Sequence, residues 1–265
     1  MSLANSGIMY LMAKSILVAN WKNHPSSIDE VRILLSQMAK KGVLYKKLSL
    51  FIAPPLPYFE SVKTRAKTFS SLASQDIFVA PGASSYTSQV TPDILKSFGV
   101  KLSIIGHSER RALGESSVDV SKKVRAAISA GIIALVCVGE SSRDKDGLYY
   151  ETLRDQIKAS LADLNDKKDV AKVMVAYEPV WAIGKGAEAI DPTDLSQSVI
   201  FIRKVLTDMF GRELAQKVSI LYGGSVDASN APTLVEKTGI KGFLVGRASL
   251  KAKDFRPIAE ALIAK

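Results

Sequence analysis

The sequence predicts an α/β fold, namely a single-domain (β/α)8 barrel. Short apolar runs alternate with helical segments along the chain, and eight such runs are found. Most of the runs are continuously apolar, which is typical of parallel strands that are covered on both faces. The length of 265 residues fits one large domain, and no linker or low-complexity tract divides it. Because eight strands that are each followed by a helix close into a barrel, we prefer this fold over an open doubly wound sheet.

The predicted strands are the eight apolar runs, of which the third is the weakest because it is short and half polar. They cover residues 15–19, 48–53, 70–73, 102–105, 132–138, 172–176, 218–222 and 242–245. Residues 1–13 precede the first strand as an N-terminal extension, so the barrel domain is expected at residues 14–265. The extension lacks the basic flank and the cleavage site of a signal peptide.

The helices are predicted from the residues that begin and end them. Ser27 and Glu30 are expected to form a capping box, apolar residues follow at helical spacing from Val31 to Met38, and Gly42 is expected to supply a left-handed stop. Proline at the first helical position and glycine after the last turn mark later helices. These signals are Thr91-Pro92 with Gly99, Asp191-Pro192 with Gly211, and Ser117 with Gly131.

The composition limits the partners that the chain is expected to have. The formal net charge of +10 suits a solvated basic surface or the attraction of an anionic metabolite into a site. The basic residues are scattered in pairs and are not interleaved with aromatic residues, so nucleic acid is not an expected partner. No apolar run approaches the roughly 20 residues that span a bilayer, so a membrane is not expected either. The single cysteine, Cys137, allows no intrachain disulfide and favours a cytoplasmic location.

Three chemically useful side chains follow predicted strands, at the end of a barrel where active sites lie. Glu178 follows the sixth strand, His107 follows the fourth and Lys22 follows the first. Together they would bring a carboxylate base, an imidazole and an ammonium group to one small ligand. Each also has a plainer interpretation, as a loop carboxylate, a histidine that caps a turn, or a surface lysine.

The neighbours of these residues refine the expected chemistry. When the lid closes, apolar neighbours are expected to exclude water from Glu178, which makes a carboxylate a stronger base. These neighbours are Trp181, Ile183 and Leu244. A helix that begins at Ser108 disfavours an added positive charge, so the imidazole of His107 is expected to stay neutral and to donate a proton to a carbonyl. Lys22 can hold a phosphate or stabilise an enolate.

Glycine-bearing turns indicate a phosphate site. They lie at residues 183–186, 222–225 and 245–249. Two of the three follow the seventh and eighth strands, where barrels commonly hold a phosphate on backbone N–H groups. Each glycine pair by itself is most often the mark of a tight turn.

Five segments match one family in order. Residues 20–22 read Asn-Trp-Lys, 105–111 read Ile-Gly-His-Ser-Glu-Arg-Arg, 176–184 read Ala-Tyr-Glu-Pro-Val-Trp-Ala-Ile-Gly, 222–226 read Tyr-Gly-Gly-Ser-Val, and 244–246 read Leu-Val-Gly. From about residue 15 onward the chain resembles the triosephosphate isomerase family, which has the TIM-barrel fold. The resemblance implies an intramolecular aldose–ketose isomerase of glycolysis and gluconeogenesis. It would interconvert dihydroxyacetone phosphate and glyceraldehyde 3-phosphate without a metal or an organic cofactor.

The resemblance also implies roles for individual residues. Glu178 takes a proton from one carbon and returns it to the next, and neutral His107 moves protons between the two oxygens, a pairing that is a known feature of this family. Lys22 and Asn20 stabilise the enediolate, and Glu109 supports Lys22. Phosphate is bound by Asn20, Lys22, Gly184, Gly224, Ser225, Gly246 and Arg247. The lid, residues 179–187, consists of Pro179, Val180, Trp181, Ala182, Ile183, Gly184, Lys185, Gly186 and Ala187.

The sequence departs from the family's pattern in the lid, in the phosphate turn and at the subunit interface. Lys185 and Ala187 stand where threonine and lysine are usual, and Arg247 stands where glycine is common, which restricts the backbone there. A homodimer is expected, but Gln89 replaces a glutamate that the family uses in an intersubunit ion pair. The altered interface residues are Asn23, His24, Ser88 and Gln89. Catalysis is therefore expected to be intact and association to be weakened.

Two rival functions are kept beside the isomerase. One is a barrel isomerase that acts on another phosphosugar, which should lack the lid signature around Glu178. The other is a non-catalytic barrel that binds a phosphorylated ligand or nucleic acid, which should have lost His107, Glu178 or Lys22. All of these features are present, so the isomerase is preferred.

Overall fold

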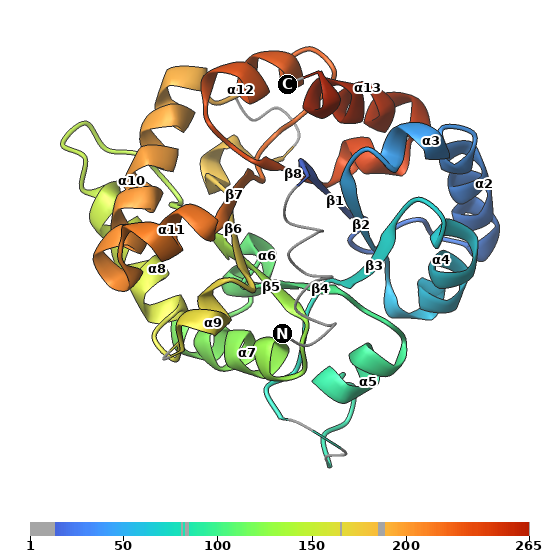
Figure 1. Ribbon diagram of the computed structural model, residues 1–265, viewed down its shortest axis with the longest axis horizontal. Coiled ribbons are helices and arrows are strands. Elements are labelled where there is room, and N and C mark those ends of the chain that lie inside the picture. The colour runs from blue at the N-terminus through green and yellow to red at the C-terminus, as the bar shows by residue number, and fades with distance from the viewer. Residues whose placement is uncertain (1–13, 81, 83–84, 165, 185–188, 265) are drawn as a thin grey trace.

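A closed barrel of parallel strands forms the centre of the molecule (Figure 1). The computed structural model describes residues 14–80, 82, 85–164, 166–184 and 189–264. The strands follow one another around the barrel in chain order. They are β1 (Ile16–Asn20), β2 (Ser49–Ala53), β3 (Ser71–Ser74), β4 (Leu102–Ile105), β5 (Ile133–Val138), β6 (Val173–Tyr177), β7 (Ser219–Tyr222) and β8 (Gly242–Val245).

The structure confirms the predicted barrel. Each strand begins and ends within one residue of its predicted run, and the weakest prediction, β3, pairs with both β2 and β4. Because β1 pairs in parallel with β8 as well as with β2, the sheet has no open edge. The alternative of an open doubly wound sheet is therefore wrong. The predicted N-terminal extension, residues 1–13, lies outside the described residues.

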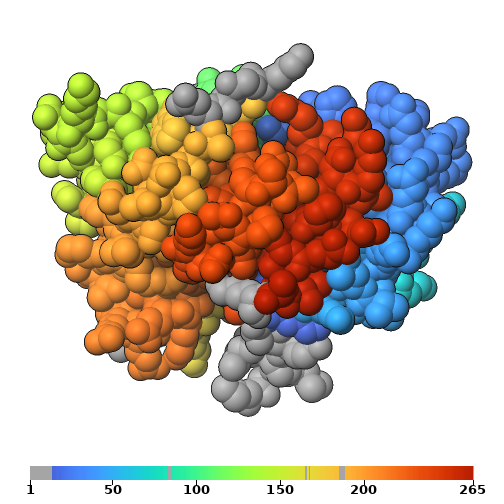
Figure 2. Space-filling view, turned by 90° about the horizontal axis from the view of Figure 1, so that it is seen from above, coloured from blue at the N-terminus to red at the C-terminus, as the bar shows by residue number. Residues whose placement is uncertain are grey.

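A ring of helices surrounds the barrel (Figure 1). The α-helices are α2 (Ile28–Ala39), α3 (Gly42–Tyr45), α4 (Phe59–Ala66), α5 (Pro92–Ser97), α6 (Ser108–Ala112), α7 (Ser117–Ser129), α8 (Tyr149–Ser160), α9 (Lys167–Val170), α10 (Pro192–Phe210), α11 (Arg212–Lys217), α12 (Ala231–Lys237) and α13 (Ala252–Ile263). Three short 3-10 helices are η1 (Leu56–Tyr58), η2 (Val180–Ala182) and η3 (Arg247–Leu250). The last helix packs beside the first ones, as the red and blue surfaces show in Figure 2. Among the described residues, no helix has both the length and the apolar character that crossing a bilayer requires.

Two details at the ends of α2 differ from the prediction. The Ser27 side chain accepts from the Glu30 N–H at 3.2 Å, but the Glu30 carboxylate accepts from the N–H and hydroxyl of Ser26, both at 3.0 Å. The reciprocal capping box is therefore not completed at this helix. Gly42 does not act as a left-handed stop, because α2 already ends at Ala39 and Gly42 begins α3 without a positive φ.

The other helix ends follow the predicted signals. Gly99, Gly131 and Gly211 have φ angles of +86°, +77° and +81° and follow α5, α7 and α10. Thr91 and Asp191 cap the helices that begin with Pro92 and Pro192. These three helices therefore end where glycine allows a positive φ.

Alternation along each strand decides which side chains enter the barrel. On β6, Met174 and Ala176 belong to the inner cluster, whereas Val175 and Tyr177 face the helices. The same period of two directs the next residue, Glu178, toward the mouth of the barrel. Asn20 continues the inner row of β1 in the same way. Position in the strand, rather than residue type, therefore aims these polar groups at one place.

Candidate active site

A cavity at the carboxyl ends of the strands collects most of the predicted site residues. Its volume is about 500 Å3. Its lining includes Asn20, Lys22, His107, Glu178, Gly184, Gly224, Ser225, Gly246 and Arg247. Glu109 lines an adjoining cavity of about 490 Å3 that shares Asn20, Lys22 and His107. The carboxylate, the imidazole and the ammonium group thus converge as the sequence predicts.

Glu178 and His107 face each other although 70 residues of chain separate them. The Glu178 Oε1 atom lies 3.2 Å from His107 Nε2. The second oxygen, Oε2, accepts a hydrogen bond of 3.0 Å from the backbone N–H of Ser108, the first residue of α6. The start of this helix therefore offers a donor to the carboxylate, and the positive end of the helix favours negative charge there.

The hydrogen bonds of His107 define its protonation. Its Nδ1 atom accepts from the backbone N–H of Glu109 at 3.2 Å, so this nitrogen presents a lone pair. A neutral ring with its proton on Nε2 fits this bond and directs an N–H at Glu178. The neighbouring Glu109 Oε2 atom is farther from Nδ1, at 3.7 Å. The geometry therefore agrees with the predicted neutral imidazole, and it specifies the tautomer, assigned from the hydrogen-bond pattern.

Both members of the pair are shielded from solvent, and the exclusion of water by a closed lid stays a prediction. Glu178 and His107 are 2% and 7% exposed. Ile183 and Leu244 line the cavity as expected. Trp181 does not, because its indole N–H donates to Glu140 Oε1 at 3.0 Å. A hydrogen-bonding partner from the loop after β5, invisible in the local sequence, turns this ring away.

Two glycines allow the chain to approach Glu178 closely. A Cβ atom on Gly139 would lie 1.9 Å from the Glu178 carbonyl oxygen. A Cβ atom on Gly223 would lie 2.8 Å from Glu178 Cγ. The residue before Gly139, Val138, accepts a 2.7 Å hydrogen bond from the Glu178 N–H. Glycine at positions 139 and 223 therefore makes room for the backbone and the side chain of Glu178 respectively.

Lys22 is held in an unusual backbone conformation, with φ of +51°. Its N–H donates to Asn20 Oδ1 at 3.0 Å, and its carbonyl accepts from Gln75 Nε2 at 2.7 Å. Its Nζ atom lies 2.8 Å from Glu109 Oε1. Burial raises the pKa of Glu109, but the hydrogen bond and charge of Lys22 outweigh this and hold the pKa below its usual value. A strained backbone of this kind is typical of functional sites.

The predicted phosphate turns lie beside one another at the cavity. Gly224 lies against the Tyr222 ring, because a Cβ atom there would be 2.2 Å from the Tyr222 hydroxyl oxygen. The N–H and hydroxyl of Ser225 both donate to the Ala182 carbonyl, at 3.2 and 2.9 Å. The backbone of Arg247 at the start of η3 does not have a positive φ, so the expected restriction by arginine causes no strain.

The predicted lid is described in part. Pro179 precedes η2, which contains Trp181 and Ala182, and Gly184 has φ of +121°. Lys185, Gly186 and Ala187 lie outside the described residues.

Sequence reasoning missed several residues that support the site. Gln75 follows β3 and also donates to the Ala53 carbonyl at 2.9 Å. Glu140 follows β5 and is 1% exposed. Arg143, three residues later, contacts Glu140. Since each of the first two follows a strand, the rule that identified Glu178 would have found them. No comparable signal marks Arg143.

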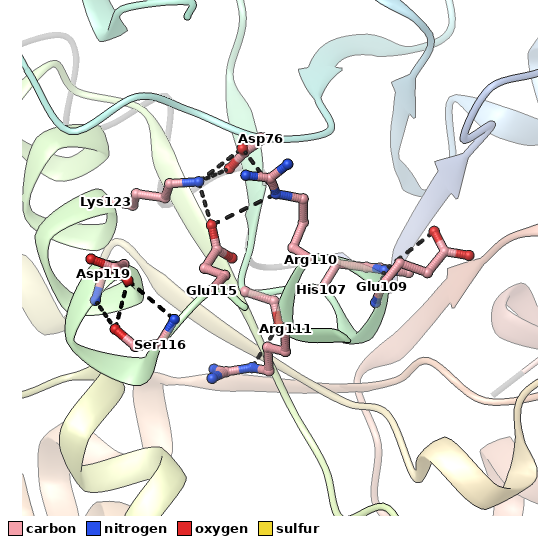
Figure 3. A network of polar contacts seen from close by, with 10 residues as sticks. Asp76, His107, Glu109, Arg110, Arg111, Glu115, Ser116, Asp119 and Lys123 are labelled. Atoms are coloured by element: carbon pink, nitrogen blue, oxygen red, sulfur yellow. Dashed lines mark hydrogen bonds and ion pairs between the residues drawn. The ribbon is translucent and has the colours of Figure 1, made fainter. Parts of the chain in front are cut away.

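A charged network anchors the helix that carries His107 (Figure 3). Lys123 from α7 lies between Asp76 and Glu115, and its Nζ atom is 2.6 Å from Asp76 Oδ1. Arg110 Nε lies 3.4 Å from Asp76 Oδ2. Arg111 points to the other side, where it donates to the Gly106 carbonyl at 2.8 Å. The network therefore ties α6 to the segment after β3. In the described part of the chain, no group of three acidic, histidine or cysteine residues is arranged to hold a metal ion.

Three of the four residues expected at a subunit interface line the adjoining cavity. Asn23, Ser88 and Gln89 line it, and Ser88 has φ of +62°. His24 is an exposed loop residue that also borders the main cavity. Their place beside Lys22 and His107 means that any chain docked there would lie close to the site.

The fold is a closed (β/α)8 barrel, and its mouth holds a shielded carboxylate opposite a neutral imidazole. These two features define the class of this chain as a barrel protein with an acid–base site. Comparison with known sequences agrees with this class. The family described as triosephosphate isomerase matches residues 15–262. The chain belongs to the triosephosphate isomerase family.

Individual relatives cover nearly the whole chain. A triosephosphate isomerase of Syntrophotalea carbinolica is 37% identical over 249 residues, which are 92% of this chain and 96% of the relative. One from Clostridium botulinum is 38% identical over 251 residues, which are 93% and 99% of the two chains. One from Flavobacterium johnsoniae is 34% identical over 254 residues, which are 95% and 100%.

Proposed function

We propose that this chain is a triosephosphate isomerase that interconverts dihydroxyacetone phosphate and D-glyceraldehyde 3-phosphate. The observation that carries the proposal is the 3.2 Å approach of His107 Nε2 to Glu178 Oε1 in a cavity that Lys22 also lines. A shielded carboxylate can take a proton from carbon, and a neutral N–H can polarise the adjoining carbonyl. The non-catalytic phosphate-binding barrel is disfavoured by the presence of all three groups.

The proposed reaction passes through an enediolate. Glu178 removes the proton from one carbon, and His107 donates its Nε2 proton to the carbonyl oxygen and takes back the hydroxyl proton of the neighbouring carbon, while Glu178 returns its proton to that carbon. The Lys22 ammonium group and the Asn20 side chain stabilise the negative charge. Glu109 holds the ammonium group through its 2.8 Å contact. Because Glu178 and His107 only carry protons from one substrate atom to another and are both restored, this scheme needs no cofactor.

Phosphate is proposed to bind between the lid after β6 and the turns after β7 and β8. The donors are the backbone of Gly184, Gly224, Gly246 and Arg247, with the side chains of Ser225 and Lys22. Ser225 now donates through both its N–H and its hydroxyl to Ala182, which lies in the proposed lid. A phosphate that takes these donors competes with the lid backbone, so phosphate binding and rearrangement of residues 179–187 are expected to be coupled.

The wider setting is also part of the proposal. Interconversion of triose phosphates places the enzyme in glycolysis and gluconeogenesis, in the cytoplasm. A homodimer is proposed, with Asn23, His24, Ser88 and Gln89 at the interface. Gln89 carries no charge, so an ion pair cannot contribute from that position.

A coupled assay with glyceraldehyde 3-phosphate tests the function. The protein should produce dihydroxyacetone phosphate, and Glu178→Asp should lower kcat by about a hundredfold or more, because it withdraws the carboxylate by one methylene group. Glu60→Asp, at an exposed position of α4, is the matched control and should keep kcat. Binding of a non-reacting triose phosphate analogue without any turnover would instead identify the non-catalytic barrel.

A further inference from the structure

Arg143 lies at the centre of a polar cluster on the outer side of β6. Its side chain is 17% exposed, and that of Glu140 is 1% exposed. Arg143 Nε lies 3.1 Å from Glu140 Oε1, and Nη1 lies 3.0 Å from Asp194 Oδ2 on α10. Nη2 donates to the Tyr177 hydroxyl at 3.0 Å and to the Ser198 hydroxyl at 2.8 Å. One guanidinium group thus joins the loop after β5, the end of β6 and α10.

The same guanidinium group lies between two aromatic rings. Its Cζ atom is 5.0 Å from the centre of the Trp181 ring and 4.9 Å from that of the Tyr149 ring. A planar cation at this distance from an indole is attracted to its face, and a lysine does not reproduce the planar stacking. Arg143 therefore contacts Trp181 directly as well as through Glu140.

The contacts of Arg143 lie on both sides of Glu178 in the chain. Tyr177 precedes Glu178, and its hydroxyl donates to Glu140 Oε1 at 2.7 Å. Trp181 follows by three residues, and its indole donates to the same oxygen at 3.0 Å. The backbone N–H of Val180 donates to the Glu140 carbonyl at 2.9 Å. The residues before and after Glu178 are thus held by one cluster, while the carboxylate of Glu178 points the other way into the cavity.

We propose that Arg143 is a positioning residue for Glu178 and sets the position of Trp181 at the start of the proposed lid. The proposal rests on the proposed isomerase function. It concerns residues 177–182, all of which are described. Its physical basis is that the forked guanidinium group bridges Glu140 and Tyr177 while it lies over the Trp181 ring, so that it fixes both ends of the segment that carries Glu178.

A purely electrostatic role is the main competing explanation. Glu140 is a buried carboxylate, and removal of its cation leaves an uncompensated charge that destabilises the fold. Two variants separate this effect from positioning. Arg143→Lys keeps a cation but loses the fork and the stacking surface. Arg143→Met combined with Glu140→Gln removes both charges together.

If Arg143 positions Glu178, the two variants should recover thermal stability but not activity. Arg143→Met alone should lower both the melting temperature and kcat. Arg143→Lys and the charge-neutral double variant should recover melting temperature, yet kcat should stay about tenfold below that of the parent with KM changed much less, because misplacement of the base affects the chemical step. Recovery of the parental kcat in either variant would overturn the proposal.

A fluorescence measurement checks the same proposal without activity. Trp21 is fully buried, so the part of the emission that acrylamide quenches reports on Trp181. Arg143→Lys should increase this quenching in the ligand-free protein, and unchanged quenching would contradict the stacking role. If the parent protein does not isomerise triose phosphates, the proposed function fails, whereas the quenching result still decides whether Arg143 positions Trp181.

Discussion

Replacement of Gly223 by alanine tests how accurately the base must be placed. The added Cβ atom would lie 2.8 Å from Glu178 Cγ, and ordinary contact begins at 3.4 Å, so the side chain must move by about 0.6 Å. A displacement of 1 Å costs about a hundredfold in rate, or about 2.7 kcal/mol. For the smaller shift of about 0.6 Å, the transition state is expected to lose about 1.6 kcal/mol of stabilisation, which lowers kcat roughly fifteenfold. KM should change less, because the methyl group is directed at Glu178.

The assay is steady-state turnover of glyceraldehyde 3-phosphate in a coupled system, with a thermal melt of each variant. Gly42→Ala is the matched control, since its Cβ atom would meet Phe69 at an ordinary 3.6 Å and Gly42 does not line the cavity. Gly139→Ala should instead destabilise the fold, because its Cβ atom would meet the Glu178 carbonyl, which the β5–β6 pairing holds in place. A Gly223→Ala protein with the parental kcat would refute the reasoning.

Three further predictions concern charge, pH and association. Lys22→Met should lower kcat by about a hundredfold or more and weaken phosphate binding, since it removes an ammonium group from the developing anion, and unchanged steady-state kinetics would refute that role. Burial raises the pKa of Tyr45 to about 12 and that of Cys137 well above its usual value. The stability that these shifts contribute is therefore fully present below about pH 8.5, the pKa of an unperturbed thiol. Because both folded pKa values lie above the unfolded ones, this stability should be lost as the pH rises toward about 12, and a flat urea midpoint over that range would contradict it. Because Gln89 of the proposed interface carries no charge, light scattering should detect monomer at low concentration, and a tight dimer at nanomolar concentration would disagree.

The pattern of apolar runs in the sequence was sufficient to predict the eight strands and the end of the barrel at which the site residues lie. The apolar runs end within one residue of the observed strands, since burial on both faces demands continuous apolar residues. The prediction for Gly42 was wrong because α2 already ends at Ala39, so that Gly42 lies at the start of the next short helix, α3. The prediction of a capping box at Ser27 was half wrong, because the Glu30 carboxylate accepts from the N–H and hydroxyl of Ser26.

The sequence by itself determined the barrel, the family and the side chains that meet at the mouth, because all of these depend on local pattern and on the order of strands. Only the tertiary structure decided the tautomer of His107, the direction of Trp181 and the central place of Arg143. Each of these depends on a hydrogen bond or contact with a group on a different loop or helix, and local sequence carries no information about which groups folding will bring within 3 to 5 Å of one another.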